Sequence, residues 1–175
     1  MLKHTKVKIE LLTDFEKLLF IEKGIRGGIS QYSHRYASAN NKYMANFQAQ
    51  KEESYLIYLD INNLYGAAMC QPLPLKDFQW CESKIDIMQI SDDADIGYIL
   101  EVDLHYPQEL HDKHNRYPLA PTNEIPPGCK EKRLLLTLND KKNYIVHYRN
   151  LKLYMKYGLK VEKIHKFCSL PKNLF

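Results

Sequence analysis

The sequence predicts an α+β domain in which an antiparallel sheet packs against helices. Short runs rich in branched and aromatic residues alternate with segments of helical period, and 45% of the 175 residues are hydrophobic, enough for a core. The runs expected to form the sheet are residues 54–60, 97–105 and 159–167, and the longest helix is expected over residues 139–157. We expect one domain, residues 1–175, that includes a proline-containing connection over residues 107–138.

The first helix is expected over residues 13–23. Thr13 is followed three residues later by Glu16, which is the capping-box pattern at the start of many helices, and Gly24 ends the segment. The polar stretch that follows contains Gly27 and Gly28, which permit positive φ or a close backbone approach. We interpret this stretch as a functional or connecting loop.

Residues 54–60, with the sequence SYLIYLD, are expected to form a strand because the run is short and rich in aromatic and branched residues. A short helix is expected next, with Asn62 or Asn63 as its N-cap and Pro72 stopping it. The sequence therefore predicts a strand, a turn and a helix, with Asp60 at the end of the strand.

The second strand, residues 97–107, alternates Leu100, Val102 and Leu104 with polar residues, so its polar face must meet water or a site. Residues 107–130 contain several prolines and no clear period, which predicts an extended connection. Apolar and aromatic residues recur every three or four positions from residue 139 to 157, which predicts a helix that Gly158 ends. Alternation over residues 159–167 predicts a half-exposed strand.

The net charge of +4 conceals an asymmetry along the chain. Residues 76–115 contain 3 basic and 10 acidic side chains, whereas residues 130–175 contain 12 basic and 3 acidic ones. A basic end suggests a polyanionic partner, and the alternative is a solvated lysine-rich face opposite acidic loops. The tyrosines between residues 144 and 157 either stack on bases beside these cations or pack in the core.

The four cysteines are far apart and form no CxxC pair, so we interpret them as reduced thiols. No apolar run reaches the roughly 18 residues that a membrane span needs, and we expect an intracellular protein without a membrane partner. His105, His111 and His114 lie near Asp103 and Asp112 in the sequence. We interpret these histidines as surface residues in preference to a metal cluster.

Asp60 raises a question because a carboxylate at the end of an apolar strand is costly unless it is hydrogen-bonded, paired, metal-bound or exposed. At a strand-to-helix turn, its carboxylate could hold a divalent cation near phosphates. Alternatively, Asp60 or Asn62 serves as a cap for the short helix. The residues alone leave both interpretations open.

Residues 58–66, with the sequence YLDINNLYG, resemble the first motif of family-B DNA polymerases, Asp-x-x-Ser-Leu-Tyr-Pro. Residues 25–28, IRGG, stand about 35 positions before Asp60 and resemble the Tyr-x-Gly-Gly motif of the protein-primed branch. Further stretches between residues 8 and 166 are similar to the polymerases of Polinton or Maverick transposons and related viruses. The resemblance implies a partial polymerase palm, and a nucleus or viral factory as its place of action.

The resemblance also implies roles for individual residues in DNA-directed DNA synthesis. Asp60 would be one of two aspartates that bind the catalytic pair of Mg²⁺ or Mn²⁺ ions, and the carbonyl of Ile61 would complete part of that coordination. Tyr65 would lie under the sugar of the incoming dNTP as a catalytic residue. Asn63 and Leu64 would join Ile61 and Tyr65 in the nucleotide site.

By the same resemblance, Arg26, Gly27 and Gly28 would approach the backbone of a DNA primer-template, with the arginine contacting phosphate. A terminal protein or a complementing polymerase chain is a further expected partner. Two family motifs are absent from the sequence, the lysine-bearing helix and the Tyr-Gly-Asp-Thr-Asp hairpin that carries the second aspartate. We therefore expect a fragment that cannot polymerise alone; the alternatives are a non-catalytic DNA-binding or interaction module derived from a transposon polymerase, and an unstable relic.

Overall fold

The computed structural model describes residues 10–74, 76–82 and 85–173. The chain divides into two compact units: unit 1 contains Met1–Ile29 and Pro72–Phe175, and unit 2 contains Ser30–Gln71. Residues 1–9 and 174–175, which belong to the predicted single domain, lie outside the described residues. Helices and an antiparallel sheet occur together, which confirms the α+β class.

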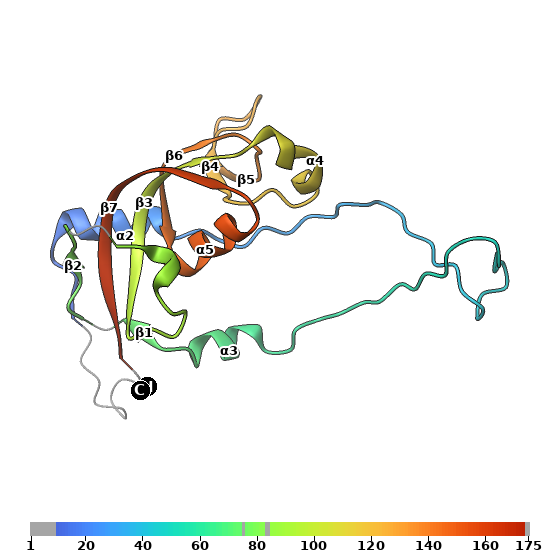
Figure 1. The fold of residues 1–175 in the computed structure, drawn as a ribbon, viewed down its shortest axis with the longest axis horizontal. Coiled ribbons are helices and arrows are strands. Elements are labelled where there is room, and N and C mark those ends of the chain that lie inside the picture. Colours follow the sequence, from blue (N-terminus) through green and yellow to red (C-terminus); the bar gives the residue numbers. More distant parts are fainter. Residues whose placement is uncertain (1–9, 75, 83–84, 174–175) are drawn as a thin grey trace. The chain divides into compact units, whose positions relative to one another are not determined.

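The sheet of unit 1 is built around its longest strand, β7 (Lys160–Asn173), and its neighbour β3 (Ile96–His105) (Figure 1). β3 also pairs antiparallel with β6 (Lys141–His147). Two short strands, β1 (Leu73–Pro74) and β2 (Gln79–Trp80), pair with β7. The strands predicted over residues 97–105 and 159–167 are therefore confirmed as β3 and β7.

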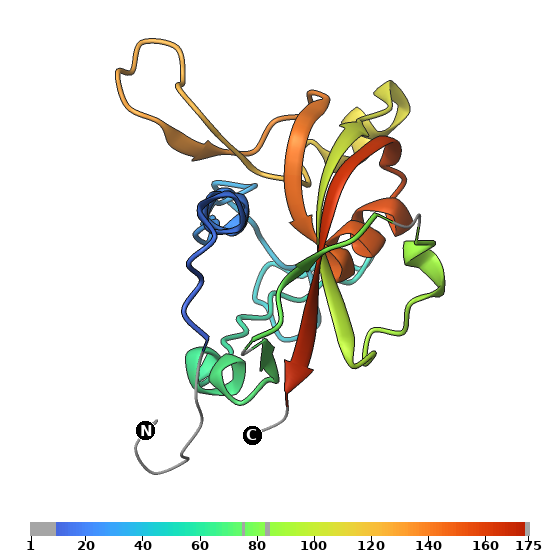
Figure 2. The same cartoon turned by 90° about the vertical axis from the view of Figure 1, so that its left-hand side faces the viewer.

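Helices cover both faces of this sheet. α2 (Phe15–Gly24), blue in Figure 2, lies on one side, where Phe20 packs with Ile145 and Cys168. α5 (Tyr148–Lys156) lies on the other side, where Tyr148 and Leu151 are fully buried. The core of that second layer includes Leu100, Val102 and Leu104, the apolar face predicted for β3.

The predicted first helix is confirmed as α2, but the predicted N-cap is wrong. Asp14 is the N-cap, and its carboxylate accepts a hydrogen bond of 3.2 Å from the backbone N–H of Lys17. This bond holds the pKa of Asp14 below its usual value. Thr13 lies one residue too early, because a cap side chain must reach the free N–H groups of the first turn.

The helix predicted over residues 139–157 is wrong in its first half. Residues 141–147 form β6, and α5 begins at Tyr148. Tyr144, Ile145 and Val146 are all buried, because helices pack on both faces of the sheet here. A strand that is covered on both sides carries consecutive apolar residues, and such a run resembles a helical pattern.

The strand predicted over residues 54–60 is also wrong. Ser54 forms an isolated bridge with Asn40, and residues 55–60 are extended without a strand partner among the described residues. Aromatic and branched side chains favour the extended backbone, but a strand also needs a neighbouring strand to accept its hydrogen bonds.

The connection over residues 107–138 contains short regular elements and is not purely extended. The 3-10 helix η2 (Gln108–Leu110) leads into α4 (His111–His114). A separate two-stranded sheet follows, formed by β4 (Thr122–Glu124) and β5 (Arg133–Leu135). Before β3, the 3-10 helix η1 (Ile87–Gln89) places the buried Ile87 in the core.

Unit 2 contains a closed loop and one short helix. The side-chain amide of Asn40 accepts from the N–H of Gln48 at 2.9 Å and donates to the carbonyls of Gln48 and Glu52, which closes the loop. The predicted helix after Asp60 is confirmed as α3 (Leu64–Met69). Asn63 is its N-cap residue in the left-handed region, with φ 53°, and makes no capping hydrogen bond with its side chain.

Candidate functional site

The residues that the polymerase resemblance singles out fall in both units. Asp60, Ile61, Asn63, Leu64 and Tyr65 belong to unit 2, where an exposed extended segment runs into α3. Tyr65 is 85% exposed and Ile61 is 70% exposed. Arg26, Gly27 and Gly28 belong to unit 1, at the exit of α2.

The surroundings of Asp60 do not fit a pair of catalytic metal ions. Within the described part of the chain, its carboxylate has neither a hydrogen-bond nor an ion-pair partner, and no group of three or more metal-ligating side chains includes it. A pair of divalent ions needs at least two carboxylates between them to offset its charge. One carboxylate and the carbonyl of Ile61 do not supply this charge, so the described residues around Asp60 do not form a two-metal centre.

Arg26 is anchored on the sheet. Its Nη1 donates to the carbonyl of Ile145 at 2.6 Å and to that of Gly24 at 3.2 Å. Its guanidinium carbon lies 4.0 Å from the centroid of the Tyr144 ring, a cation–π contact. The guanidinium has five N–H donors, so these contacts leave others for a ligand.

Gly27 and Gly28 follow Arg26, and no neighbouring atom requires glycine at either position. A Cβ added to either would meet no atom within 4 Å, and the glycines that have positive φ in the described residues are Gly128 and Gly158. The backbone at Gly27 and Gly28 is therefore open to the close approach of another molecule.

A basic groove lies beside Arg26 in unit 1. It has a volume of about 590 Å³ and is bordered by α2, β6 and β4. Its basic side chains are Lys23, Arg26, Lys132, Lys141 and Lys142, and its acidic ones are Glu124 and Asp140. The sequence did not predict this groove, because its cations come from segments more than 100 residues apart.

Lys141 is the buried lysine of the groove. It is 3% exposed, and its Nζ donates to the carbonyl of Thr137 at 3.2 Å and also to the hydroxyl of Thr137. Burial lowers the pKa of Lys141, while the negative charges of Glu124 and Asp140 oppose this shift. The exposed cations of the groove are therefore Lys23, Lys132 and Lys142, with Arg26 half-buried among them.

A polar network lies on the same side of the sheet as the groove. Asp103 accepts from the backbone N–H of Asn143 at 2.9 Å, and its carboxylate lies 3.0 Å from His165 Nε2 and 3.7 Å from Lys142 Nζ. The Asn143 bond is the main reason that the pKa of Asp103 is lowered. Lys142 Nζ also lies 2.7 Å from Glu162 Oε2, which raises the pKa of Lys142.

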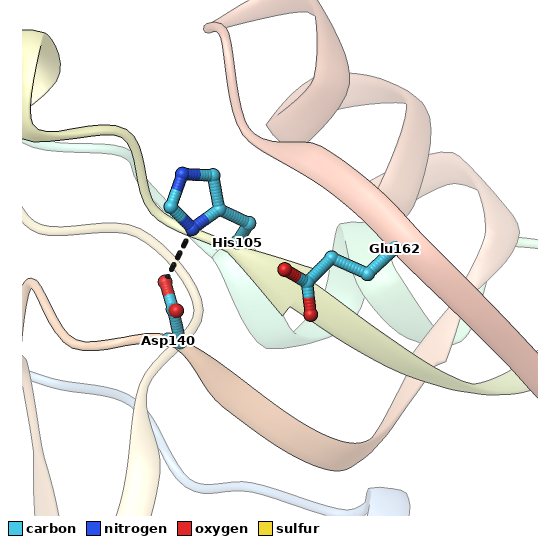
Figure 3. Close-up of side chains that lie close together, drawn as sticks. All are labelled: His105, Asp140 and Glu162. Carbon is cyan, nitrogen blue, oxygen red and sulfur yellow. Dashed lines mark hydrogen bonds and ion pairs between the residues drawn. The ribbon is translucent and has the colours of Figure 1, made fainter.

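His105, Asp140 and Glu162 gather at one end of this network (Figure 3). His105 Nδ1 lies 3.0 Å from Asp140 Oδ1, and the same oxygen accepts the N–H of Tyr106 at 2.7 Å. This last bond is the main reason that the pKa of Asp140 is lowered. The sequence places His105 near Asp103 and Asp112 and gives no sign of this cluster, because Asp140 and Glu162 are more than 30 residues away.

The other histidines of that interpretation contact Tyr106. His114 Nδ1 lies 2.7 Å from the Tyr106 hydroxyl, and His111 Nε2 lies 3.3 Å from the Tyr106 carbonyl. His111 and His114 therefore hold the connection after β3 through Tyr106, and neither belongs to the cluster that contains His105. Of the tyrosines between residues 144 and 157, Tyr144 and Tyr148 pack in the core, because they are only 4% and 0% exposed.

No family model, curated protein or solved structure matches this chain. None of the described helices is both long and apolar enough to cross a membrane.

Proposed function

We propose that this chain is a fragment of a protein-primed family-B DNA polymerase that binds DNA through its basic groove and does not extend a primer alone. The stretches YLDINNLYG and IRGG support the family. The observation that carries the DNA-binding part is the position of Arg26, the arginine of IRGG, in a groove with four lysines.

The groove is suited to a phosphate backbone more than to a small anion. Lys23, Lys132 and Lys142 are exposed, and the 590 Å³ volume is open enough for an extended backbone. Glu124 and Asp140 moderate the positive charge and disfavour unselective binding of any polyanion. If three or four cations contact phosphates, log Kd should change with log salt by a slope of about 3.

The test is fluorescence anisotropy of a labelled primer-template duplex titrated with the chain over a salt series, in EDTA and then with Mg²⁺. Affinity should fall linearly with log salt, because each phosphate contact releases counterions. Lys156→Ala is the matched control, since Lys156 is an exposed lysine at the end of α5 and does not line the groove. The absence of binding at low salt would overturn the proposal. A loss of DNA affinity in Lys156→Ala as large as that in the groove variant Lys132→Ala would also overturn it.

Primer extension tests the catalytic part of the proposal. The purified chain with Mg²⁺ and dNTPs should not lengthen the primer, because Asp60 belongs to no group of three or more metal-ligating side chains in the described residues. Extension that disappears in Asp60→Ala would contradict this expectation.

A second candidate function is a non-catalytic DNA-binding module derived from a transposon polymerase, and the isolated position of Asp60 favours it. The two candidates differ when a separate chain supplies the missing lysine helix and Tyr-Gly-Asp-Thr-Asp hairpin. Extension in the mixture that requires both Asp60 and Tyr65 would support the polymerase fragment. DNA binding without extension in the mixture would support the module.

A further inference from the structure

Three neighbouring strands bring His105, Asp140 and Glu162 to one end of the sheet. His105 ends β3, Asp140 directly precedes β6, and Glu162 lies in β7 (Figure 3). Asp103 pairs with Lys163 and Leu104 pairs with Val161, so Glu162 is the extra residue of a β-bulge. Bulges redirect side chains, and this one turns Glu162 out of the regular alternation of β7.

The spacing of the side chains suits a single cation. One ligand atom from each residue lies within 4.8 Å of the other two, and His105 Nδ1 and Asp140 Oδ1 are 3.0 Å apart. Two ligands of one ion bound at about 2.1 Å lie roughly 3–4 Å apart. The Glu162 side chain is 43% exposed, so a change of rotamer can bring its carboxylate into range.

The two closest ligand atoms already face each other. His105 Nδ1 and Asp140 Oδ1 are 3.0 Å apart, a distance at which the nitrogen either donates its proton to the carboxylate or shares a metal ion with it. The N–H of Tyr106, a residue that is 3% exposed, donates to the same oxygen, Asp140 Oδ1, at 2.7 Å and fixes the position of the carboxylate. Such a fixed second partner is typical of ligating carboxylates.

The charge around the cluster also favours a cation. The ammonium group of Lys142 lies 2.7 Å from Glu162 and 3.7 Å from Asp103, and the buried Lys141 interacts with Asp140. The three carboxylates of Asp103, Asp140 and Glu162 therefore outnumber the two lysines beside them. Lys142 competes with an ion for Glu162, so its removal should strengthen metal binding.

We propose that His105, Asp140 and Glu162 form a binding site for a divalent first-row transition metal ion. One imidazole and two carboxylates suit Mn²⁺ or Zn²⁺ better than Mg²⁺, which prefers oxygen ligands and water. The site goes beyond the proposed function, because it uses none of the residues of the polymerase motif. It lies next to the basic groove, since Asp140 and Lys142 also line that groove.

Mn²⁺ is the better probe, because the exposed thiols of Cys70 and Cys129 would also take Zn²⁺. Electron paramagnetic resonance measures free Mn²⁺ as the metal is titrated into the full chain. We expect one bound Mn²⁺ per chain, a loss of affinity of about tenfold or more in Asp140→Asn and in Glu162→Gln, and tighter binding in Lys142→Met. A tenfold excess of Mg²⁺ should not displace the ion.

Two further variants are controls. Asp112→Asn changes an exposed carboxylate on α4 outside the cluster and should leave Mn²⁺ affinity unchanged. Asp60→Asn should also leave it unchanged, and a loss of binding there would place the ion at Asp60 and overturn the proposal. The asparagine in Asp140→Asn can still accept the N–H of Tyr106, and Glu162 is exposed, so both variants should fold.

Absence of Mn²⁺ binding by the wild-type chain, or equal binding by the Asp140→Asn and Glu162→Gln variants, would overturn the proposal. DNA binding is measured separately in EDTA, where this ion is absent. Failure of the metal site and failure of the proposed DNA binding are therefore distinguishable.

Discussion

Arg26 combines two roles that a sequence motif does not separate. Its guanidinium faces the basic groove, but it also packs on Tyr144 and donates to the carbonyl of Ile145. These contacts tie the end of α2 to β6. The arginine is therefore part of the fold as well as a candidate phosphate ligand.

Arg26→Ala should reduce both stability and DNA affinity. Loss of the cation–π contact and of a charged hydrogen bond to a buried strand should lower the free energy of unfolding by about 1–3 kcal/mol, measured by urea denaturation. Lys132→Ala is the matched variant, because Lys132 is exposed and lines the groove. It should preserve stability and reduce the salt slope of DNA binding by about one.

A fall in DNA affinity for Arg26→Ala without a loss of stability would show that its contacts to β6 contribute little. An unchanged salt slope for Lys132→Ala would remove the groove from the DNA interface.

Asp14 gives a test with a definite pH dependence. Its folded-state pKa is lowered, chiefly by the N–H of Lys17, so its carboxylate stabilises the fold above the unfolded value of 3.8. That stabilisation is lost as the pH falls through the folded pKa. Asp14→Ala should therefore lower the melting temperature at pH 7, and the difference from wild type should shrink as the pH falls below 3.8.

Thr13→Ala is the control for this measurement, which uses thermal unfolding followed by circular dichroism. It should have little effect at either pH, because Asp14 and not Thr13 is the N-cap. A larger effect of Thr13→Ala than of Asp14→Ala would restore the capping box expected from the sequence.

At the scale of elements, the sequence correctly predicts the helices and strands that a pattern of neighbouring residues identifies. The alternation of Leu100, Val102 and Leu104 identified β3, and Gly158 correctly marked the end of α5. The buried run of Tyr144, Ile145 and Val146 predicts a helix wrongly, because the sequence does not show that both faces of β6 are covered. Residues 54–60 have the composition of a strand but lack a partner, and pairing is a property of the fold, not of the segment.

The candidate sites were harder to predict for the same reason. The groove combines Lys23 and Arg26 with Lys132 and Lys142, and the metal cluster takes one residue from β3, one from the turn before β6 and one from β7. No local spacing connects such residues. Motif resemblance could identify Arg26 and Asp60, but it could not reveal that Arg26 is anchored or that Asp60 stands apart from other ligands.

Gly158 provides a prediction at the turn between α5 and β7. Its φ is +100°, and an added Cβ would come within 3.0 Å of Leu110 Cδ1. Gly158→Ala should lower the free energy of unfolding by more than about 1 kcal/mol, because backbone strain and crowding add. Gly128→Ala is the matched control, since it has φ +79° but no atom within 4 Å of an added Cβ.

The comparison is made by urea denaturation of both variants. Gly128→Ala should cost less than Gly158→Ala, and the difference measures the crowding at Leu110. Equal losses would mean that Leu110 moves aside freely.

At the scale of the whole molecule, the two units differ in how their backbones are held. Unit 1 has a sheet with helices on both faces, whereas residues 55–60 of unit 2 are extended, with Tyr58 93% exposed and Leu59 84% exposed. Proteases cleave segments that are exposed and lack backbone pairing.

Limited digestion with chymotrypsin should cut first at exposed residues of unit 2 such as Tyr36, Tyr58 or Leu59, well before the buried Tyr144 and Tyr148 of unit 1. Mass spectrometry of the early fragments identifies the site. Early cleavage within β3 or β6 instead would mean that the sheet opens more readily than the segment over residues 55–60. Protection of that segment when DNA is added would place it near the bound nucleic acid.

The position of β7 in the chain has a consequence for synthesis. β3 ends at His105 and its main partner begins at Lys160, so at roughly 5–20 residues per second the ribosome needs several seconds to supply β7 after β3 is complete. During that interval Leu100, Val102 and Leu104 have no β7 to pair with, and the nascent chain exposes an apolar strand. Rare codons between these strands would lengthen the wait, and a chaperone that binds apolar segments would find its target there.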